Sequence, residues 1–219
     1  MNRLAYAEQG WPVGHRIAAV VLAAGSSRRM GWRNKLLIEI AGRPIIAHTV
    51  DAVIDSKATD VIVVTGYQRS RLEHALHGKR VRFVHNANYR HGLSSSLRCG
   101  LATLGPHCAA ALICLGDMPL VTSRDIDRLI SAFQQLPQPE VCACTFAGAR
   151  GHPVILPRAI LPDLAGLQGD VGAQQWIARN SNRLHGVNMK TDAVLADIDS
   201  PRSLHRLRDA IQLYKLKHV

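Results

Sequence analysis

Three clusters of residues in this sequence have side chains suited to binding phosphate groups and a metal ion. The first is Leu22-Ala-Ala-Gly-Ser-Ser-Arg-Arg-Met-Gly31, with Lys35 shortly after it. Gly25 and the two serines allow backbone N–H groups to approach a phosphate closely. Arg28 can donate paired hydrogen bonds to phosphate oxygens, and Lys35 can neutralise charge on an α-phosphate. We therefore assign a nucleotide's phosphates to Leu22, Ala23, Ala24, Gly25, Ser26, Ser27, Arg28 and Lys35.

This first cluster also has a plainer explanation. In that explanation Gly25 only ends a strand, and the basic residues that follow lie at the surface. The cluster matches neither of the two common glycine-rich nucleotide motifs, because it has no Gly-Lys-Ser/Thr ending and no Gly-x-Gly-x-x-Gly pattern. On its own, the cluster leaves both explanations open.

The second cluster is Gly116-Asp117-Met118-Pro119, directly after an apolar run. A carboxylate at the end of a buried strand is well placed to hold Mg²⁺, a cation that is often bound by few protein oxygens and bridges phosphates. The sequence therefore predicts Asp117 as a metal ligand. The alternative is a turn-forming aspartate before a helix.

The third cluster is His85-Asn-Ala-Asn-Tyr-Arg-His-Gly-Leu-Ser-Ser-Ser96. Its amides and hydroxyls could read a base edge and, at the start of a helix, bind an anion. We assign Asn86, Gly92 and Ser95 to the nucleotide site on this basis. The alternative is that Ser94 or Ser95 only caps the helix.

The elements that must position these clusters are predicted by apolar runs that alternate with helical patterns. Runs at 17–24, 60–65, 81–84, 109–115 and 141–146 are typical of strands, and the first indicates a strand buried on both faces. We predict an α/β fold of three layers, with a mostly parallel central sheet and helices on both faces. Ligands bind at the carboxyl ends of such strands, where all three clusters fall. Beyond Gly148 we predict loops at 148–153 and 167–172, and a final helix from about residue 201.

Composition limits the domain organisation and the partners. The 219 residues, 47% of them hydrophobic, favour a single domain, which we place at 16–219 after an N-terminal extension at 1–15. The net charge of +11 favours anionic partners, but no nucleic-acid motif accompanies the scattered basic residues, so we expect small substrates. The five cysteines lack framework spacing and no apolar run could span a bilayer. We therefore expect a cytoplasmic protein without membrane contact.

Together the clusters resemble the molybdenum cofactor nucleotidyltransferases, and most closely their cytidylyltransferase subgroup. The resemblance rests on motifs that occur in the same order: Leu22-Ala-Ala-Gly-Ser-Ser-x-x-Met-Gly31, Asn34-Lys-Leu-Leu37, Val63-Val-Thr-Gly66 and Gly116-Asp-Met-Pro119. It continues in Arg150-Gly-His-Pro-Val154, Gly169-Asp-Val-Gly-Ala173 and Asp197-Ile-Asp-Ser-Pro201. The similarity therefore covers roughly residues 17–207.

The resemblance implies a Rossmann-like fold of the nucleotide-diphospho-sugar-transferase type. It implies that a nucleoside triphosphate reacts with a phosphorylated acceptor and releases pyrophosphate, with Lys35, Arg28 and Asp117 as the catalytic residues. It also implies that Gly66 belongs to the nucleotide site and that Asp199 is a second carboxylate for Mg²⁺. We assign His152 and Asp170 to the acceptor, and Asp170 could bind the metal instead; a structural role in a loop or turn is the alternative for both.

The same resemblance bears on the base and the acceptor. Ala24 stands where guanylyl relatives usually carry a second glycine, which favours CTP. The implied acceptor is the molybdenum–molybdopterin cofactor, with a molybdenum hydroxylase as the protein that later receives it. Gln174 replaces an arginine that the family often has, so acceptor recognition departs from the usual pattern here. The alternatives are a guanylyltransferase, a sugar- or alditol-phosphate nucleotidyltransferase, and a non-catalytic cofactor chaperone for the hydroxylase.

Overall fold

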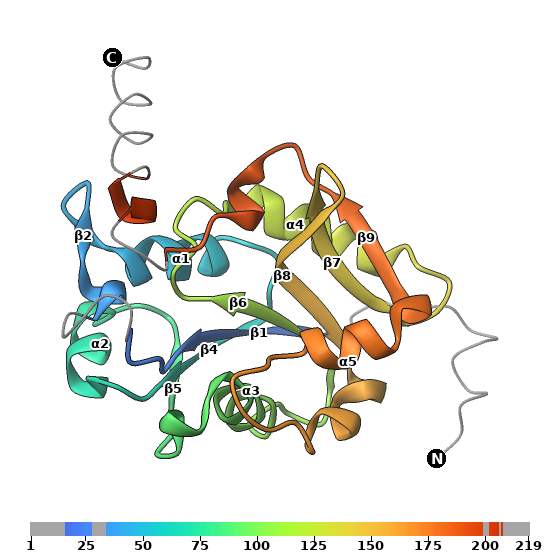
Figure 1. The fold of residues 1–219 in the computed structure, drawn as a ribbon, viewed down its shortest axis with the longest axis horizontal. Helices are drawn as coiled ribbons and strands as arrows, with labels where there is room; N and C mark the ends of the chain where they lie inside the picture. Colours follow the sequence, from blue (N-terminus) through green and yellow to red (C-terminus); the bar gives the residue numbers. More distant parts are fainter. Residues whose placement is uncertain (1–15, 28–33, 199–201, 206, 208–219) are drawn as a thin grey trace.

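The computed structural model describes residues 16–27, 34–198, 202–205 and 207, and a seven-stranded sheet forms the centre of this part of the chain (Figure 1). The strand order is β5-β4-β1-β6-β8-β7-β9. β8 is antiparallel to both of its neighbours, and the other pairings are parallel. The strands are β1 Arg16–Ala23, β4 Asp60–Thr65, β5 Arg82–His85, β6 Cys108–Leu115, β7 Val141–Phe146, β8 Ala149–Pro157 and β9 Leu184–Asn188. The predicted extension at 1–15 lies outside the described residues.

Helices cover both faces of this sheet, with α1 and α4 on one side and α3 and α5 on the other (Figure 1). The helices are α1 Ile45–Ile54, α2 Arg69–Ala75, α3 Leu93–Leu101, α4 Ser123–Gln134 and α5 Gln174–Arg179. Short 3-10 helices are η2 Lys35–Leu37, η3 Tyr89–His91, η4 Arg158–Leu164, η5 Ser181–Arg183 and η6 Asp192–Leu195, and β2 Glu39–Ile40 pairs with β3 Arg43–Pro44. The predicted three-layer α/β fold is therefore confirmed.

Alternate residues of β1 enter two separate hydrophobic cores. Ala19 and Val21 pack into the core that α1, α2 and α4 share, whereas Val20 and Leu22 pack into the core of α3 and α5. All four are buried. A strand covered on both faces has no polar alternation, which explains why its sequence is a continuous apolar run.

The region after Gly148 differs from the sequence prediction. The loop predicted at 148–153 is wrong, because β8 begins at Ala149 and pairs with β7 through a tight hairpin, with Phe146 opposite Ala149. Ala147 and Gly148 form the hairpin turn, and both have positive φ, which matches the right-handed twist of paired strands. The 167–172 loop contains no helix or strand, as predicted. Of the predicted final helix, residues 202–205 and 207 are helical and the remainder lies outside the described residues.

Gly100 allows α3 to lie directly against the sheet. A Cβ built at Gly100 would lie 2.4 Å from Val20 Cγ1 and 2.9 Å from Val64 Cγ2. We expect Gly100→Ala to lower the free energy of unfolding by about 1–3 kcal/mol, because overpacking outweighs the better helix propensity of alanine. Urea denaturation measures the change. Gly105→Ala is the matched control, since a Cβ there meets nothing within 4 Å; equal stability of the two variants would contradict the close approach.

Candidate functional site

The three clusters identified in the sequence meet at one edge of the sheet. β5, β4, β1 and β6 are parallel neighbours, and their last residues lie in register. Ala23 at the end of β1 pairs with Thr65 of β4, and Leu22 pairs with Leu115 of β6. Each of the three clusters follows one of these strands, so a ligand at this edge can contact all of them.

A cleft of about 630 Å³ opens at this edge, a volume typical of small-molecule sites. Its lining includes many of the residues assigned from the sequence: Leu22, Ala23, Ala24, Gly25, Ser26, Ser27, Lys35, Gly92, Asp117 and Asp170. Gly66, Asn86, Ser95 and His152 do not line it. Arg28 and Asp199 lie outside the described residues.

The loop after β1 presents its backbone to this cleft. A Cβ built at Gly25 would meet nothing within 4 Å, and Gly25, Ser26 and Ser27 line the cleft. The loop is held from both sides, because Tyr67 N–H donates to the Ala24 carbonyl at 3.1 Å and Lys35 N–H donates to Ser27 Oγ at 3.1 Å. Ser27 has φ +52°. The result is a fixed, open turn of the kind that binds anions.

Asn34 holds the segment that carries Lys35. Its side chain is buried, and Oδ1 accepts from Leu36 N–H at 3.1 Å, which caps η2. Its Nδ2 donates to the Tyr67 carbonyl at 3.4 Å. The sequence showed Asn34 beside Lys35 but suggested no role for it. The structure gives it one, since it anchors the start of η2 to the residue that also holds Ala24.

Lys35 and Asp117 form an ion pair within the cleft. Lys35 Nζ donates to Asp117 Oδ2, and the two side chains are 19% and 11% exposed. The carboxylate is positioned by the turn before it, where Gly116 N–H donates to the Leu22 carbonyl at 3.0 Å and Thr49 Oγ donates to the Gly116 carbonyl at 3.2 Å. One cation and one anion are thus brought together next to the loop that follows β1.

Asp197 is a third carboxylate residue of the cleft, besides Asp117 and Asp170, and we assigned it no role from the sequence. Ile198 N–H donates to the Asp117 carbonyl at 3.1 Å, which holds the segment of Asp197 beside Asp117. Two carboxylates are oxygen ligands of the type that Mg²⁺ prefers. Within the described ranges no group of three or more His, Cys, Asp or Glu could hold a metal. The sequence signal for Asp197 was its place in the Asp197-Ile-Asp199 pattern, in which we assigned only Asp199 to the metal.

Gly66, Asn86 and Ser95 support the cleft from behind. A Cβ at Gly66 would lie 2.7 Å from Tyr89 Cβ and 2.8 Å from Ala24 Cβ, so only glycine fits between these residues. Asn86 is 4% exposed, and its Nδ2 donates to Ser95 Oγ at 2.9 Å. Ser95 Oγ in turn lies 2.8 Å from the Gly92 carbonyl. These side chains join the end of β5 to the start of α3.

The cleft wall between Asn86 and Gly92 contains further residues that the sequence did not assign. Tyr89, Arg90 and His91 form η3 and line the cleft. The Arg90 guanidinium lies 5.9 Å from the centre of the Tyr89 ring, a cation–π distance. They fall inside the third cluster, so their position in a loop after a strand was the only available signal.

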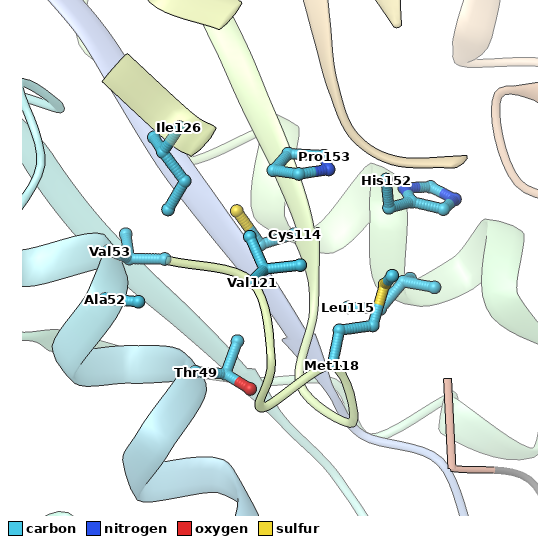
Figure 2. Close-up of a pocket in the computed structure, with 10 residues that line it drawn as sticks. All are labelled: Thr49, Ala52, Val53, Cys114, Leu115, Met118, Val121, Ile126, His152 and Pro153. Atoms are coloured by element: carbon cyan, nitrogen blue, oxygen red, sulfur yellow. The ribbon is translucent and has the colours of Figure 1, made fainter. Parts of the chain in front are cut away.

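His152 lies in a separate small cavity rather than in the cleft (Figure 2). Figure 2 shows this cavity of about 10 Å³ between α1, β6 and β8, with mostly apolar side chains around it, including Val53, Cys114 and Met118. His152 Nδ1 is buried and has no hydrogen-bond partner among the described residues. Burial lowers the pKa of His152, and the Ile113 backbone and the Asp117 carboxylate offset that effect only partly.

The lowered pKa of His152 predicts an acid-sensitive stability. Below the ordinary pKa of 6.5 the unfolded chain binds a proton at His152 that the folded chain takes up only at lower pH, so stability falls as the pH drops through 6.5. His152→Gln should remove this contribution, which is at most about 1.4 kcal/mol per pH unit. Urea denaturation at pH 7.5 and 5.5 measures it. Equal pH dependence of the variant and the wild type would show that His152 is not buried in its neutral form.

Within the described residues, no helix is both long enough and apolar enough to cross a membrane. All five cysteines are free thiols, and Cys142 and Cys144 are buried on the same face of β7. Burial raises the pKa of both thiols, that of Cys142 to about 12. These cysteines therefore serve as small core residues.

Comparison with known sequences shows that most of this chain, including Lys35 and Asp117, matches a nucleotidyltransferase family. The family model described as a MobA-like NTP transferase domain matches residues 19–185. The bifunctional protein GlmU of Sorangium cellulosum (strain So ce56) is 36% identical over 126 residues, which are 54% of this chain and 26% of that protein. The chain thus spans about a quarter of the length of this relative. Nicotine blue oxidoreductase of Paenarthrobacter nicotinovorans is 23% identical over 87% of this chain and 96% of its own length.

Solved structures share the fold of this chain over about nine tenths of its length. A nucleotidyl transferase from Methanothermobacter thermautotroptrophicus (Mth528) superposes with a TM-score of 0.80 at 28% identity, covering 92% of this chain and 100% of that one. Rv0371C of Mycobacterium tuberculosis H37Rv, solved in complex with manganese, gives a TM-score of 0.74 at 25% identity, covering 89% and 98%. Because the family model covers most of the chain and includes the loop after β1, Lys35 and Asp117, the chain belongs to the MobA-like NTP transferase domain family.

Proposed function

We propose that this nucleotidyltransferase transfers CMP from CTP to the phosphate of a molybdenum–molybdopterin cofactor and releases pyrophosphate. The observation that carries the proposal is the single cleft that joins the open turn at Gly25 to the Lys35–Asp117 ion pair. An anion-binding turn, a cation and a carboxylate are the groups that a triphosphate and its metal ion require. The motifs that resemble the cytidylyltransferase subgroup support the choice of substrates.

In the proposed reaction a phosphate oxygen of the acceptor attacks the α-phosphorus of CTP. A new P–O bond forms there, and the bond from the α-phosphorus to the bridging oxygen breaks, so that pyrophosphate leaves. The attacking phosphate is already an anion, so no side chain has to remove a proton. Lys35, Arg28 and the backbone N–H groups around Gly25 stabilise the negative charge that develops during transfer.

A divalent cation fits the carboxylates of the cleft, with Asp117 as the first ligand. The sequence motif offers Asp199 as a second ligand, and Asp197 lines the cleft next to Asp117. Rv0371C was solved in complex with manganese, which supports the use of a divalent ion by a protein of this fold; we propose Mg²⁺ for this chain. When bound, the ion would neutralise charge on the phosphates. Asp117 would hold the ion, and Lys35 beside it would contact the α-phosphate.

The base and the acceptor are tested by turnover with defined substrates. The purified chain, Mg²⁺ and molybdenum–molybdopterin cofactor are combined with CTP, GTP, UTP or ATP, and pyrophosphate is measured. CTP should give the highest kcat/KM, since Ala24 stands where guanylyl relatives carry glycine. Faster turnover with GTP would overturn the base assignment. Pyrophosphate release with a sugar or alditol phosphate in place of the cofactor would overturn the acceptor.

Gln174 departs from the family pattern at a position linked to the acceptor. The family often has an arginine there for the anionic part of the acceptor, whereas Gln174 is exposed at the start of α5 and does not line the cleft.

A non-catalytic chaperone that passes the cofactor to a molybdenum hydroxylase is the remaining alternative. Tight binding of the cofactor without pyrophosphate release under any triphosphate would favour the chaperone.

A further inference from the structure

The N-terminus of α3 is capped by a loop that is distant in the sequence. Leu93 N–H donates to Asp170 Oδ1 at 3.1 Å, and Ser94 N–H donates to the Gly169 carbonyl at 3.2 Å. Ser94 Oγ donates to the same carbonyl at 2.8 Å. The N-cap residue itself is Gly92, which has no side chain to do this. The first N–H groups of α3, which would otherwise attract an anion, are thus already satisfied within the chain.

Glycines permit the loop and the helix to approach this closely. Gly92 has φ +91°, and a Cβ built there would lie 2.4 Å from the Gly169 carbonyl oxygen. A Cβ at Gly172 would lie 3.0 Å from Leu93 Cδ2. Gly92, Leu93, Gly169 and Asp170 all line the cleft. The contact between the 167–172 loop and α3 therefore forms part of the cleft wall.

We propose that Asp170 is a positioning residue that caps α3 from a distance and thereby fixes the wall of the nucleotide site at Gly92 and Ser96. Asp170 acts through the helix and not by contact with the substrate. This replaces the acceptor-binding role suggested by the sequence, and it rests on the proposed nucleotidyltransferase function. Its consequence is that loss of the Asp170 cap weakens binding of the triphosphate.

Two other roles for Asp170 predict different results. If its negative charge acted only through space, its removal from an anion-binding cleft would tighten triphosphate binding. If Asp170 contacted the acceptor directly, the affinity for triphosphate alone would not change. A positioning role predicts that the loss of Asp170 weakens triphosphate binding. The through-space role predicts tighter binding, and the acceptor-contact role predicts no change.

Calorimetric titration with the Mg²⁺ complex of CTP or GTP, whichever the wild type binds more tightly, tests this without acceptor. Asp170→Ala should weaken binding about 5-fold, because the triphosphate would then have to order the start of α3, at about the free energy that the cap otherwise supplies. Asp170→Asn should stay within about 2-fold of the wild type, because asparagine keeps the Oδ1 acceptor and caps about as well. Hydrogen exchange should also become faster at the Leu93 and Ser94 amides in Asp170→Ala.

Asp127→Ala is the matched control. Asp127 Oδ1 accepts from Lys57 N–H at 2.7 Å, which is the same kind of carboxylate-to-backbone bond across a similar sequence separation, and Asp127 does not line the cleft. Its triphosphate affinity should equal that of the wild type. Unchanged or tighter binding by Asp170→Ala would overturn the proposal, as would equal weakening in Asp170→Asn. Failure of the wild type to bind either triphosphate would overturn the proposed function, and this inference with it.

Discussion

Lys35→Ala is expected to lower kcat for pyrophosphate release by about 10²–10³-fold, the effect of removing one well-placed charge from a transition state. Lys35 lies in the cleft, and its ammonium group is already held in place by Asp117. The loss should appear mainly in kcat, because the interaction strengthens as charge develops during transfer. Initial-rate measurements of pyrophosphate release, over a range of triphosphate concentrations, separate kcat from KM.

Lys79→Ala is the matched control for Lys35→Ala. Lys79 Nζ forms an ion pair with Asp51 at a similar exposure, 23% and 30%, and neither residue lines the cleft. The control should retain the kcat of the wild type, because a partly exposed ion pair contributes little to stability. If Lys35→Ala also kept near-normal turnover, Lys35 would not stabilise the transition state.

Asp117→Ala should lower kcat by a similar factor, about 10²–10³-fold, and raise the Mg²⁺ concentration needed for activity. The carboxylate is the ligand that the proposed cation requires, and its loss also leaves the largely buried Lys35 ammonium without its partner. Asp117→Asn keeps the shape of the side chain and isolates the loss of charge. Pyrophosphate release measured across a Mg²⁺ titration distinguishes weaker metal binding from slower chemistry.

The two outcomes for Asp117→Asn have different meanings. Recovery of activity at high Mg²⁺ would support a role in metal binding, whereas a low kcat at saturating Mg²⁺ would indicate a role in the chemical step. Activity equal to the wild type at every Mg²⁺ concentration would contradict both roles. Asp51→Asn, which changes an ion-paired carboxylate away from the cleft, serves as the control.

The central strands could be predicted from sequence because they are buried on both faces. β1, β4 and β6 are near-continuous apolar runs, as strands of a covered parallel sheet must be. β8 could not be predicted, since its first residues, Ala149-Arg-Gly-His, are polar or small and its buried half follows Pro153. β9 has one buried residue, Val187, and therefore lacked the apolar signal of a strand.

The position of the cleft was predictable because several residues that line it come directly after predicted strands. Asp117 and the loop that follows β1 come directly after parallel strands, which place them at one edge whatever the details of packing. The roles of Asn86 and Ser95 were not predictable, because an amide or hydroxyl that lines a site and one that is buried behind it have the same sequence pattern. Asp170 reaches α3 through a contact that only the folded chain creates.

Transfer of the α-phosphate is the most direct test of the proposed function. CTP labelled with ³²P at the α-position is incubated with the chain, Mg²⁺ and purified molybdenum–molybdopterin cofactor, and products are separated. The label should appear in the cytosine dinucleotide form of the cofactor, with one pyrophosphate released for each labelled product. Label that stays in CTP, with no pyrophosphate from any triphosphate, would contradict nucleotidyl transfer at this cleft.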